Sequence, residues 1–131
     1  MIGLDTNVLV RYLVKDDPRQ ASKASAYIRS AIERSETLFL NHIVLCEVVW
    51  VLESAYRYPK NAVLDVLEKV LLTKQFRIER KDEVWAALEE YRENEGDFAD
   101  YLIGRANHSR GCEHTVTFDQ TLKGSQTFRV L

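Results

Sequence analysis

Four acidic residues stand where the sequence could place reactive groups. Asp5 follows the apolar run MIGL, and Glu47 interrupts residues 43–52, the most apolar stretch of the chain. Asp100 lies within DFADYLIG, and Asp119 follows HTVTF. Removing an ionised carboxylate from water is costly, so each either points to solvent or has a partner.

Glu47 is the hardest of the four to explain as a purely structural residue. Its helical neighbours three and four positions away are all apolar: Ile43, Val44, Trp50 and Val51. No basic side chain lies within reach on the same helix, so no local ion pair accounts for the charge. Either Glu47 points out of the core or it is held against a cation.

Carboxylates that share a site repel one another, which raises their pKa values and destabilises the fold. A divalent cation reverses this effect, and carboxylate oxygens with open water positions suit Mg²⁺ or Mn²⁺. A water bound to such a metal is a nucleophile, and the metal stabilises charge that develops at phosphorus. Two isolated cysteines and three histidines without ligand spacing offer no comparable case for zinc.

Each acidic residue also has a structural interpretation, which the sequence alone leaves open. Asp5 is followed by Thr6 and could cap a helix, and Asp119 could be a turn residue. Asp97 and Asp100 are three positions apart, so one of them could cap the helix that follows. Asp97 is the better fit to a cap, because it directly follows a glycine.

The hydrophobic pattern predicts the elements that must position these residues. Short apolar runs predict strands at 1–4, 37–41, 76–79, 114–118 and 128–131. Between them, apolar residues recur every three or four positions, as in amphipathic helices.

Capping signals mark where the helices begin and end. Residues 16–18, DDP, supply an Asp cap and a proline at the first helical position, Asn41 could cap the next helix, and Pro59 opens another. Gly96 and Gly111 are expected to end the last two helices.

Strands and helices alternate along the whole chain, which predicts an α/β fold with a parallel sheet covered by helices on both faces. With 131 residues and no repeat or linker, we expect a single domain spanning residues 1–131. Ligands of such folds bind at the carboxyl ends of the strands. Topology places Asp5, Glu47 and Asp119 at that edge but does not assign Asp100, whose helix follows another helix.

Four segments in order, LDTNVLV, LCEVVWVL, DFADYLIGRA and TFD, resemble the motifs of PIN-domain nucleases. Within these the chain is most similar to VapC-type toxins of bacterial toxin–antitoxin pairs. The resemblance covers essentially the whole chain. It implies a PIN-like α/β/α sandwich with a central parallel sheet of about four to five strands, and a Mg²⁺- or Mn²⁺-dependent endoribonuclease activity.

The resemblance also implies roles for individual residues. The catalytic acidic positions of the family fall here on Asp5, Glu47, Asp100 and Asp119, of which Asp5 and Asp100 are the usual metal ligands. Glu47 and Asp119 would add to the metal site, and Asp97 also matches a position that is often acidic.

Three polar positions of the family, which orient the carboxylates, fall here on Thr6, Asn7 and Thr117. Two departures are mild. Cys46 stands where a small residue is common, and FDQTLKG lacks the aromatic residue that often follows the last Asp.

The family implies a cognate antitoxin and an RNA substrate as partners, and favours a homodimer. Apolar residues in excess of one stripe make the helices at 17–34 and 59–73 candidate surfaces for these protein partners. No segment has the ~18 consecutive apolar residues of a membrane span, and the N-terminus does not resemble a signal peptide, so we expect a cytoplasmic protein without membrane contact.

The net charge of −2 argues against simple electrostatic binding of nucleic acid. With the four catalytic acids set aside, the rest of the chain carries about +2, which is compatible with RNA read locally by shape. Six cations are candidates to contact RNA, although each could equally be a solvated surface residue: Arg11, Lys15, Lys23, Arg105, Arg110 and Lys123.

Other functions remain open. A haloacid-dehalogenase-like phosphatase needs a second acidic residue where Asn7 stands, and a phosphorylated receiver domain needs an acidic pair and a late lysine that this chain lacks. A stand-alone RNA-processing PIN nuclease is the nearest alternative. A catalytically silent PIN-like binding module is a further one, although the presence of all four acidic positions argues against it.

Overall fold

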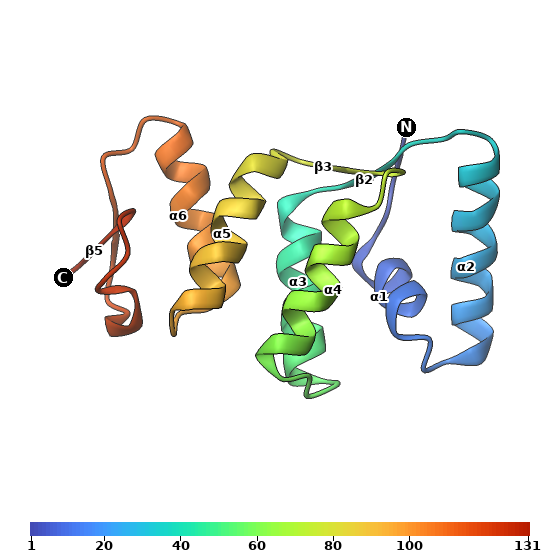
Figure 1. Cartoon of the computed structure of the whole chain (residues 1–131), viewed down its shortest axis with the longest axis horizontal. Helices are drawn as coiled ribbons and strands as arrows, with labels where there is room; N and C mark the ends of the chain where they lie inside the picture. Colours follow the sequence, from blue (N-terminus) through green and yellow to red (C-terminus); the bar gives the residue numbers. More distant parts are fainter. The chain divides into compact units, whose positions relative to one another are not determined.

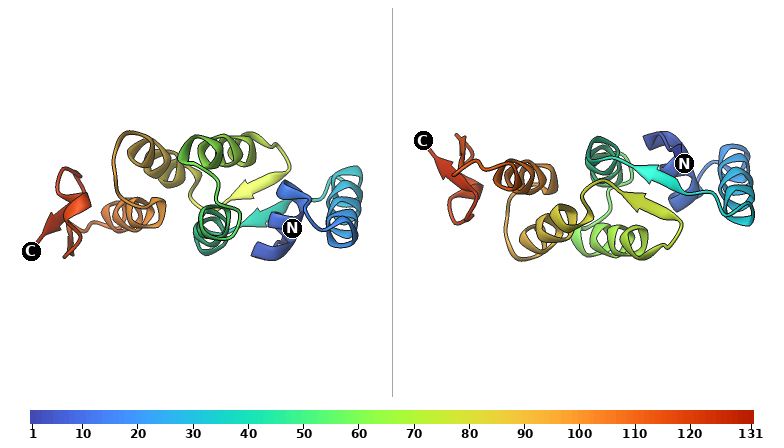
Figure 2. Two further views of the ribbon diagram at one scale, coloured as in Figure 1. Left: turned by 90° about the horizontal axis from the view of Figure 1, so that it is seen from below. Right: turned by 90° about the horizontal axis from the view of Figure 1, so that it is seen from above.

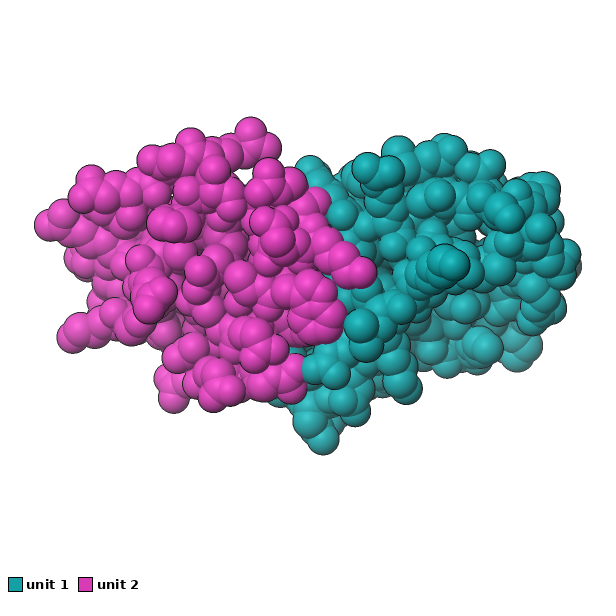
Figure 3. All heavy atoms as spheres, turned by 45° about the horizontal axis from the view of Figure 1, so that its top comes forward, with its two compact units in different colours: residues 1–79 teal, residues 80–131 magenta.

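The computed structural model describes all residues, 1–131, and divides into two compact units, Met1–Glu79 and Arg80–Leu131 (Figure 3). The five strands form two parallel sheets, β1-β2-β3 in unit 1 and β4-β5 in unit 2. The predicted α/β class with parallel strands is confirmed. The sequence suggests a single sheet, because apolar runs identify strands but do not specify which strand edges pair.

Unit 1 alternates strands and helices as the sequence predicts (Figure 1). Its elements are β1 (Ile2–Gly3), α1 (Thr6–Val14), α2 (Pro18–Glu33), β2 (Leu38–Leu40), α3 (His42–Ser54), α4 (Lys60–Leu72) and β3 (Phe76–Ile78). Ile2 pairs with Leu38, and Leu38 pairs with Phe76 on its other side. Both connections between neighbouring strands contain helices, as parallel pairing requires.

The core of unit 1 lies where the helices meet the sheet. Leu38 and Leu40 of β2 and Leu45 and Leu52 of α3 are fully buried. Helix α1 packs against α2 and α3, and α4 packs against α3 and β3. Figure 2 shows β2 and β3 side by side with the helices of this unit around them. This packing holds the carboxyl end of β1, where Asp5 follows the strand.

Two of the predicted caps are present in unit 1. Asp17 accepts a hydrogen bond from the Gln20 N–H at 3.0 Å, and Asn41 accepts one from the Val44 N–H at 2.9 Å. Pro59 is the residue before α4 and provides no side-chain cap. Asn41 therefore fixes the first turn of α3, the helix that carries Glu47.

Replacing Asn41 by Ala is expected to lower the free energy of unfolding by about 1 kcal/mol, because the Val44 N–H loses its acceptor. Urea denaturation followed by circular dichroism measures the change. Asn61→Ala is the matched control, since Asn61 is exposed on α4, and it should leave stability nearly unchanged. Equal effects of the two substitutions would contradict the capping role.

Unit 2 consists of α5 (Lys81–Glu93), α6 (Phe98–Ser109), β4 (Thr115–Thr117), the short 3-10 helix η1 (Gln120–Leu122) and β5 (Phe128–Val130). Helices α5 and α6 pack extensively on each other, and β4 pairs in parallel with β5. The buried rings of Tyr91 and Phe98 meet edge to face with their centroids 6.0 Å apart. Apolar packing thus fixes α6, the helix that carries Asp100.

The prediction that Gly96 ends a helix is wrong, because α5 ends at Glu93 with Asn94 as its C-cap. Gly96 is needed for close packing instead. Its N–H donates to the buried Tyr101 hydroxyl at 2.9 Å, and a Cβ there would lie only 2.6 Å from both Tyr101 and Leu122. Gly111 does follow the end of α6 as predicted, with a φ of 97° that favours glycine.

None of the helices combines the length and the apolar character that a membrane-spanning segment needs.

Candidate active site

In unit 1, Thr6 joins the first two acidic candidates. Asp5 is the N-cap of α1, and its Oδ1 accepts a hydrogen bond from the Thr6 N–H at 2.9 Å. The Thr6 hydroxyl donates to Glu47 Oε1 at 2.8 Å across 41 residues of sequence. Thr6 itself is buried. A polar residue in the core therefore orients two carboxylates that come from different elements.

The structure shows whether the Glu47 side chain points into the core or out of it. The apolar faces of α3 are buried through Val44, Leu45 and Val48, while Glu47 lies on the exposed face. Its charge therefore points out of the core. Its partner is the neutral hydroxyl of Thr6 and not a cation on the same helix.

Asp5 has the structural role that the sequence allows and is still accessible. It caps α1 through Oδ1 and is exposed. Beside it, an open pocket of about 600 Å³ lies among β1, α1 and α2, with Asn7 and Lys23 in its lining. Capping thus occupies one oxygen of a carboxylate that faces an accessible space.

Arg11 also lines this pocket but is bound to an acidic partner. Its guanidinium donates to Asp16 Oδ1 at 2.9 Å and to the Tyr56 hydroxyl at 3.0 Å. Hydrogen bonds from Tyr56 and then from Arg11 lower the pKa of Asp16 below its ordinary value. Of the two candidate cations at the pocket, Lys23 is therefore the more suitable to meet a phosphate.

In unit 2, Asp97 and Asp119 lie near enough to Asp100 for their charges to act on it, and we call these three residues the acidic cluster. Burial raises the pKa of Asp100, and the negative charges of Asp97 and Asp119 raise it further. A hydrogen bond from the Asp97 backbone opposes the shift. All charged groups that contribute to this shift are carboxylates, so the cluster concentrates negative charge.

Asp97 stands at the N-cap position that the sequence suggests, but its side chain does not act as a cap. Asp97 is the residue before α6, but its side chain makes no capping hydrogen bond. Asp100, in the first turn of α6, lies where the helix dipole favours negative charge.

Asp119 combines a turn role with its place in the acidic cluster. Its Oδ1 accepts hydrogen bonds from the Thr121 N–H at 2.9 Å and the Thr121 hydroxyl at 2.7 Å. These bonds lower the pKa of Asp119 below its ordinary value. The Thr117 hydroxyl accepts from the Asp119 N–H at 3.0 Å, so Thr117 holds the backbone of this residue.

The donor set has the chemistry of a site for a hard divalent cation. Every candidate ligand is a carboxylate oxygen, the kind of ligand that Mg²⁺ and Mn²⁺ prefer. Within either unit, no three His, Cys, Asp or Glu side chains converge as a group that could hold a metal. The fit therefore rests on the type of donor and on the charge that gathers around Asp100.

Sequence reasoning did not single out Glu90, because a glutamate on an amphipathic helix is usually solvated. In the structure its side chain is only 12% exposed and pairs with Arg105 at 2.6 Å. Arg105, a candidate RNA contact from sequence, is thus held by an acidic partner. No local signal identifies this pair, since the residues lie on two helices and 15 positions apart.

A comparison with protein families identifies the family to which these motifs belong. The family model described as PIN domain matches residues 2–124. The chain belongs to the PIN domain family. The match includes all five acidic candidates and nearly all elements of both units, with β5 beyond its end. The resemblance noted from the motifs is confirmed, and with it the fold class.

One curated relative adds to this comparison. A VapC ribonuclease from Aquifex aeolicus (strain VF5) is 26% identical over 120 residues, which cover 92% of this chain and 88% of the relative. The similarity therefore runs through both units. It agrees with the VapC-like order of motifs in the sequence.

Proposed function

We propose that this PIN-domain chain is a Mg²⁺- or Mn²⁺-dependent endoribonuclease and the toxin of a toxin–antitoxin pair, with residues 1–131 acting as one nuclease domain. The observation that carries the proposal is the acidic cluster, in which carboxylates alone contribute the charge around Asp100. The likeness to a VapC ribonuclease supports the choice of RNA as substrate. The family match across both units supports a single functional domain.

The proposed ligands of the cation are Asp5 and Asp100, with Glu47, Asp119 and Asp97 as further acidic residues around it. A divalent cation held there would supply an activated water and would stabilise negative charge at the scissile phosphate. The repulsion that raises the pKa of Asp100 would be relieved when the cation binds.

The chain's own residues orient these carboxylates. Thr6 holds Asp5 through its backbone and Glu47 through its hydroxyl. Thr117 and Thr121 hold Asp119 from both sides in sequence. Because Asp5, Glu47 and Asp119 are held before substrate arrives, these three carboxylates need little reorganisation during the reaction.

Cations that are not tied to an acidic side chain are the better candidates for contacts to RNA. Asp16 and Glu90 bind Arg11 and Arg105, respectively. The remaining candidates are Lys15, Lys23, Arg110 and Lys123, and Lys23 lines the pocket beside Asp5. With so few cations, binding is expected to depend only moderately on salt.

Replacing Glu47 by Gln is expected to reduce RNA cleavage at least about 10-fold while changing the free energy of unfolding by less than about 0.5 kcal/mol. The amide oxygen still accepts from Thr6, so only the charge is lost. Cleavage of labelled RNA and thermal melting of the metal-free protein are the two measurements. A folded variant with the parent's cleavage rate would exclude Glu47 from the catalytic set.

The toxin assignment predicts a small antitoxin that inhibits the enzyme. A cationic side chain of that partner could pair with the exposed carboxylates and compete with metal. The partner would also need an apolar anchor, since exposed charge pairs contribute little.

Most of the apolar excess that the sequence shows on α4 is not available as such an anchor. Five of its seven Val and Leu residues are buried in unit 1, Val66 is half-buried and Leu72 is exposed. On α2, Tyr27 is exposed beside the buried Ala24 and Ile28. The exposed part of α2 is therefore the better candidate surface for the antitoxin or for a second copy in a homodimer.

The experiment that tests the toxin assignment is co-expression of the chain with its adjacent open reading frame, with an affinity tag on one product. We expect the two proteins to co-purify, and we expect the neighbour to abolish cleavage of total RNA by the isolated chain. Failure to co-purify, with cleavage unchanged when the neighbour is added, would favour a stand-alone RNA-processing nuclease. Absence of any cleavage would favour a silent PIN-like binding module.

A further inference from the structure

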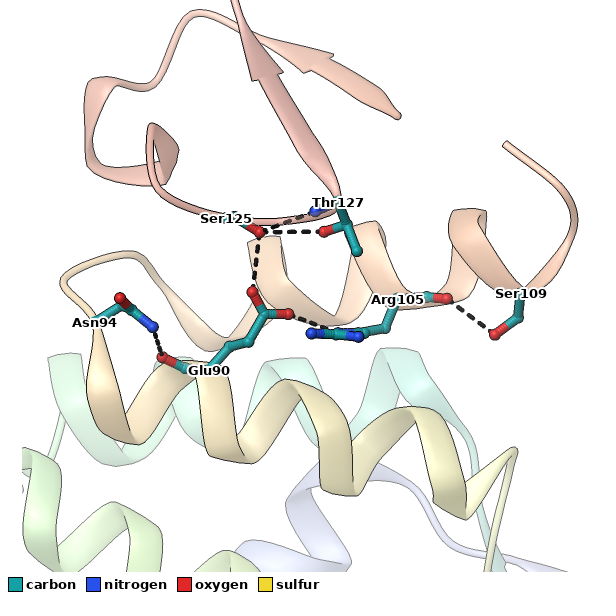
Figure 4. A network of polar contacts seen from close by, with 6 residues as sticks. All are labelled: Glu90, Asn94, Arg105, Ser109, Ser125 and Thr127. Carbon is teal, nitrogen blue, oxygen red and sulfur yellow. Dashed lines mark hydrogen bonds and ion pairs between the residues drawn. The ribbon is translucent and has the colours of Figure 1, made fainter. Parts of the chain in front are cut away.

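A carboxylate on α5 connects two segments of unit 2 that carry candidate metal ligands. Glu90 Oε1 accepts from Arg105 Nε at 2.6 Å, and Glu90 Oε2 accepts from the Ser125 hydroxyl at 2.9 Å (Figure 4). Arg105 belongs to α6, the helix of Asp100. Ser125 lies in the segment that follows Asp119 and η1.

The connection is partly buried. The side chains of Glu90 and Arg105 are 12% and 26% exposed, so their ion pair is less screened than a surface pair. Ser125 also accepts from the Thr127 N–H at 3.3 Å, and Thr127 is 2% exposed. Both oxygens of Glu90 are therefore bound to fixed partners, which makes Glu90 unsuited to bind a metal itself.

The bonds at Asp119 do not by themselves place it relative to α6. Its hydrogen-bond partners, Thr117 and Thr121, lie two residues away on either side. They orient Asp119 within its own loop only. The distance from Asp119 to Asp100 must instead be set by contacts between this part of the chain and the helices. Two of these contacts are polar: the Asn107 side chain of α6 donates to the Thr115 hydroxyl of β4 before Asp119, and Ser125 donates to Glu90 after it.

We propose that Glu90 is a positioning residue that sets the separation of Asp100 and Asp119 by binding Arg105 and Ser125 together, and thereby tunes the affinity for the divalent cation. The inference rests on the proposed function, because it assumes that the acidic cluster takes part in metal binding. Arg105 lies on the same helix as Asp100, and Ser125 follows Asp119 by six residues, so the two bonds of Glu90 link the segments that carry these carboxylates.

Glu90→Gln is the first test. An amide carries one acceptor oxygen and one NH2 donor and no charge, so it loses the ion pair with Arg105 and cannot accept from both partners as the carboxylate does. The Ser125 hydroxyl would have to accept instead of donate, although it already accepts from the Thr127 N–H. Glu89→Gln is the matched control, since it removes the same charge from the adjacent residue, which is 60% exposed and pairs only loosely with Arg92 at 3.6 Å.

The primary measurement is the dissociation constant for Mn²⁺, followed by electron paramagnetic resonance of the free ion. We expect Glu90→Gln to raise this constant about 10-fold, as for other residues that hold metal ligands in place, and Glu89→Gln to leave it unchanged. Cleavage by Glu90→Gln should return to the parent rate at saturating Mn²⁺, because the bound cation draws the carboxylates together. A purely stabilising role would lower the melting temperature without changing the constant.

Amide hydrogen exchange in the metal-free protein gives a second readout. Glu90→Gln should accelerate exchange at Leu122, Lys123 and Ser125, whose N–H groups bond within the loop, and Glu89→Gln should not. If Glu90→Gln does not fold, Ser125→Ala replaces it, since that variant removes a single hydroxyl. The same changes at smaller amplitude are then expected.

Two outcomes separate this inference from the proposed function. A parent protein that binds Mn²⁺, together with folded Glu90→Gln and Ser125→Ala variants of unchanged affinity, overturns the positioning role alone. A parent protein that binds no Mn²⁺ and cleaves no RNA overturns the proposed function and the positioning role with it.

Discussion

Replacing Asp100 by Asn is expected to reduce RNA cleavage at least about 100-fold and to leave the metal-free protein as stable as the parent or more stable. The loss of activity should be at least as large as that seen when residues that merely support metal ligands are changed, about 10- to 100-fold. The stability should not fall, because the substitution removes one negative charge from the acidic cluster. Rates on labelled RNA and melting temperatures measure the two effects.

The raised pKa of Asp100 predicts how the stability difference between the Asn variant and the parent changes with pH. The pKa of Asp100 is raised in the folded protein, so folding disfavours its ionised form. The resulting loss of stability grows as pH rises from the ordinary Asp value through the raised pKa, and it is complete above that pKa. The Asn variant should therefore gain on the parent at neutral pH and match it in acid. A variant that melts well below the parent at neutral pH would show that Asp100 is mainly structural.

Replacing Gly104 by Val is expected to lower the free energy of unfolding by about 3 kcal/mol, the upper part of the range for overpacked sites. A Cβ at Gly104 would overlap the buried Thr127 side chain and would lie 2.6 Å from the ring of Phe128. Neither neighbour can move without disturbing the contact of α6 with β5. Urea denaturation measures the loss.

Gly124→Val is the control for this substitution. A Cβ at Gly124 would have no atom within 4 Å of it, so the same side chain should have little effect there. Similar stabilities for the two variants would mean that α6 does not pack closely on Thr127 and Phe128. In that case this contact would not help to hold α6, the helix that carries Asp100.

The order of elements is accessible from sequence because it depends on local signals. The proline at position 18 and the caps Asp17 and Asn41 act within one helical turn, and both caps are present. The strands follow from short apolar runs. Their division into two sheets does not, because pairing depends on which edges meet and not on composition.

The candidate site shows the same division between local and distant interactions. The acidic residues can be chosen from their spacing and motifs, and the cap role of Asp5 is an open alternative in the sequence that proves correct. The bond from Thr6 to Glu47 spans 41 residues, and no periodicity predicts it. The role of Gly96 escapes the sequence for a similar reason, since Tyr101 packs against it from the next helix.

The measurement that tests the central claim most directly is cleavage of one labelled RNA by the purified chain as a function of divalent cation. The chain is first freed of metal with EDTA, and Mg²⁺ or Mn²⁺ is then added back, with Asp5→Asn and Asp100→Asn measured beside the parent. We predict no cleavage in EDTA, full recovery on addition of either cation, and no recovery in the two variants. Full activity in the chelator, or recovery in both variants, would contradict metal-dependent cleavage by these carboxylates.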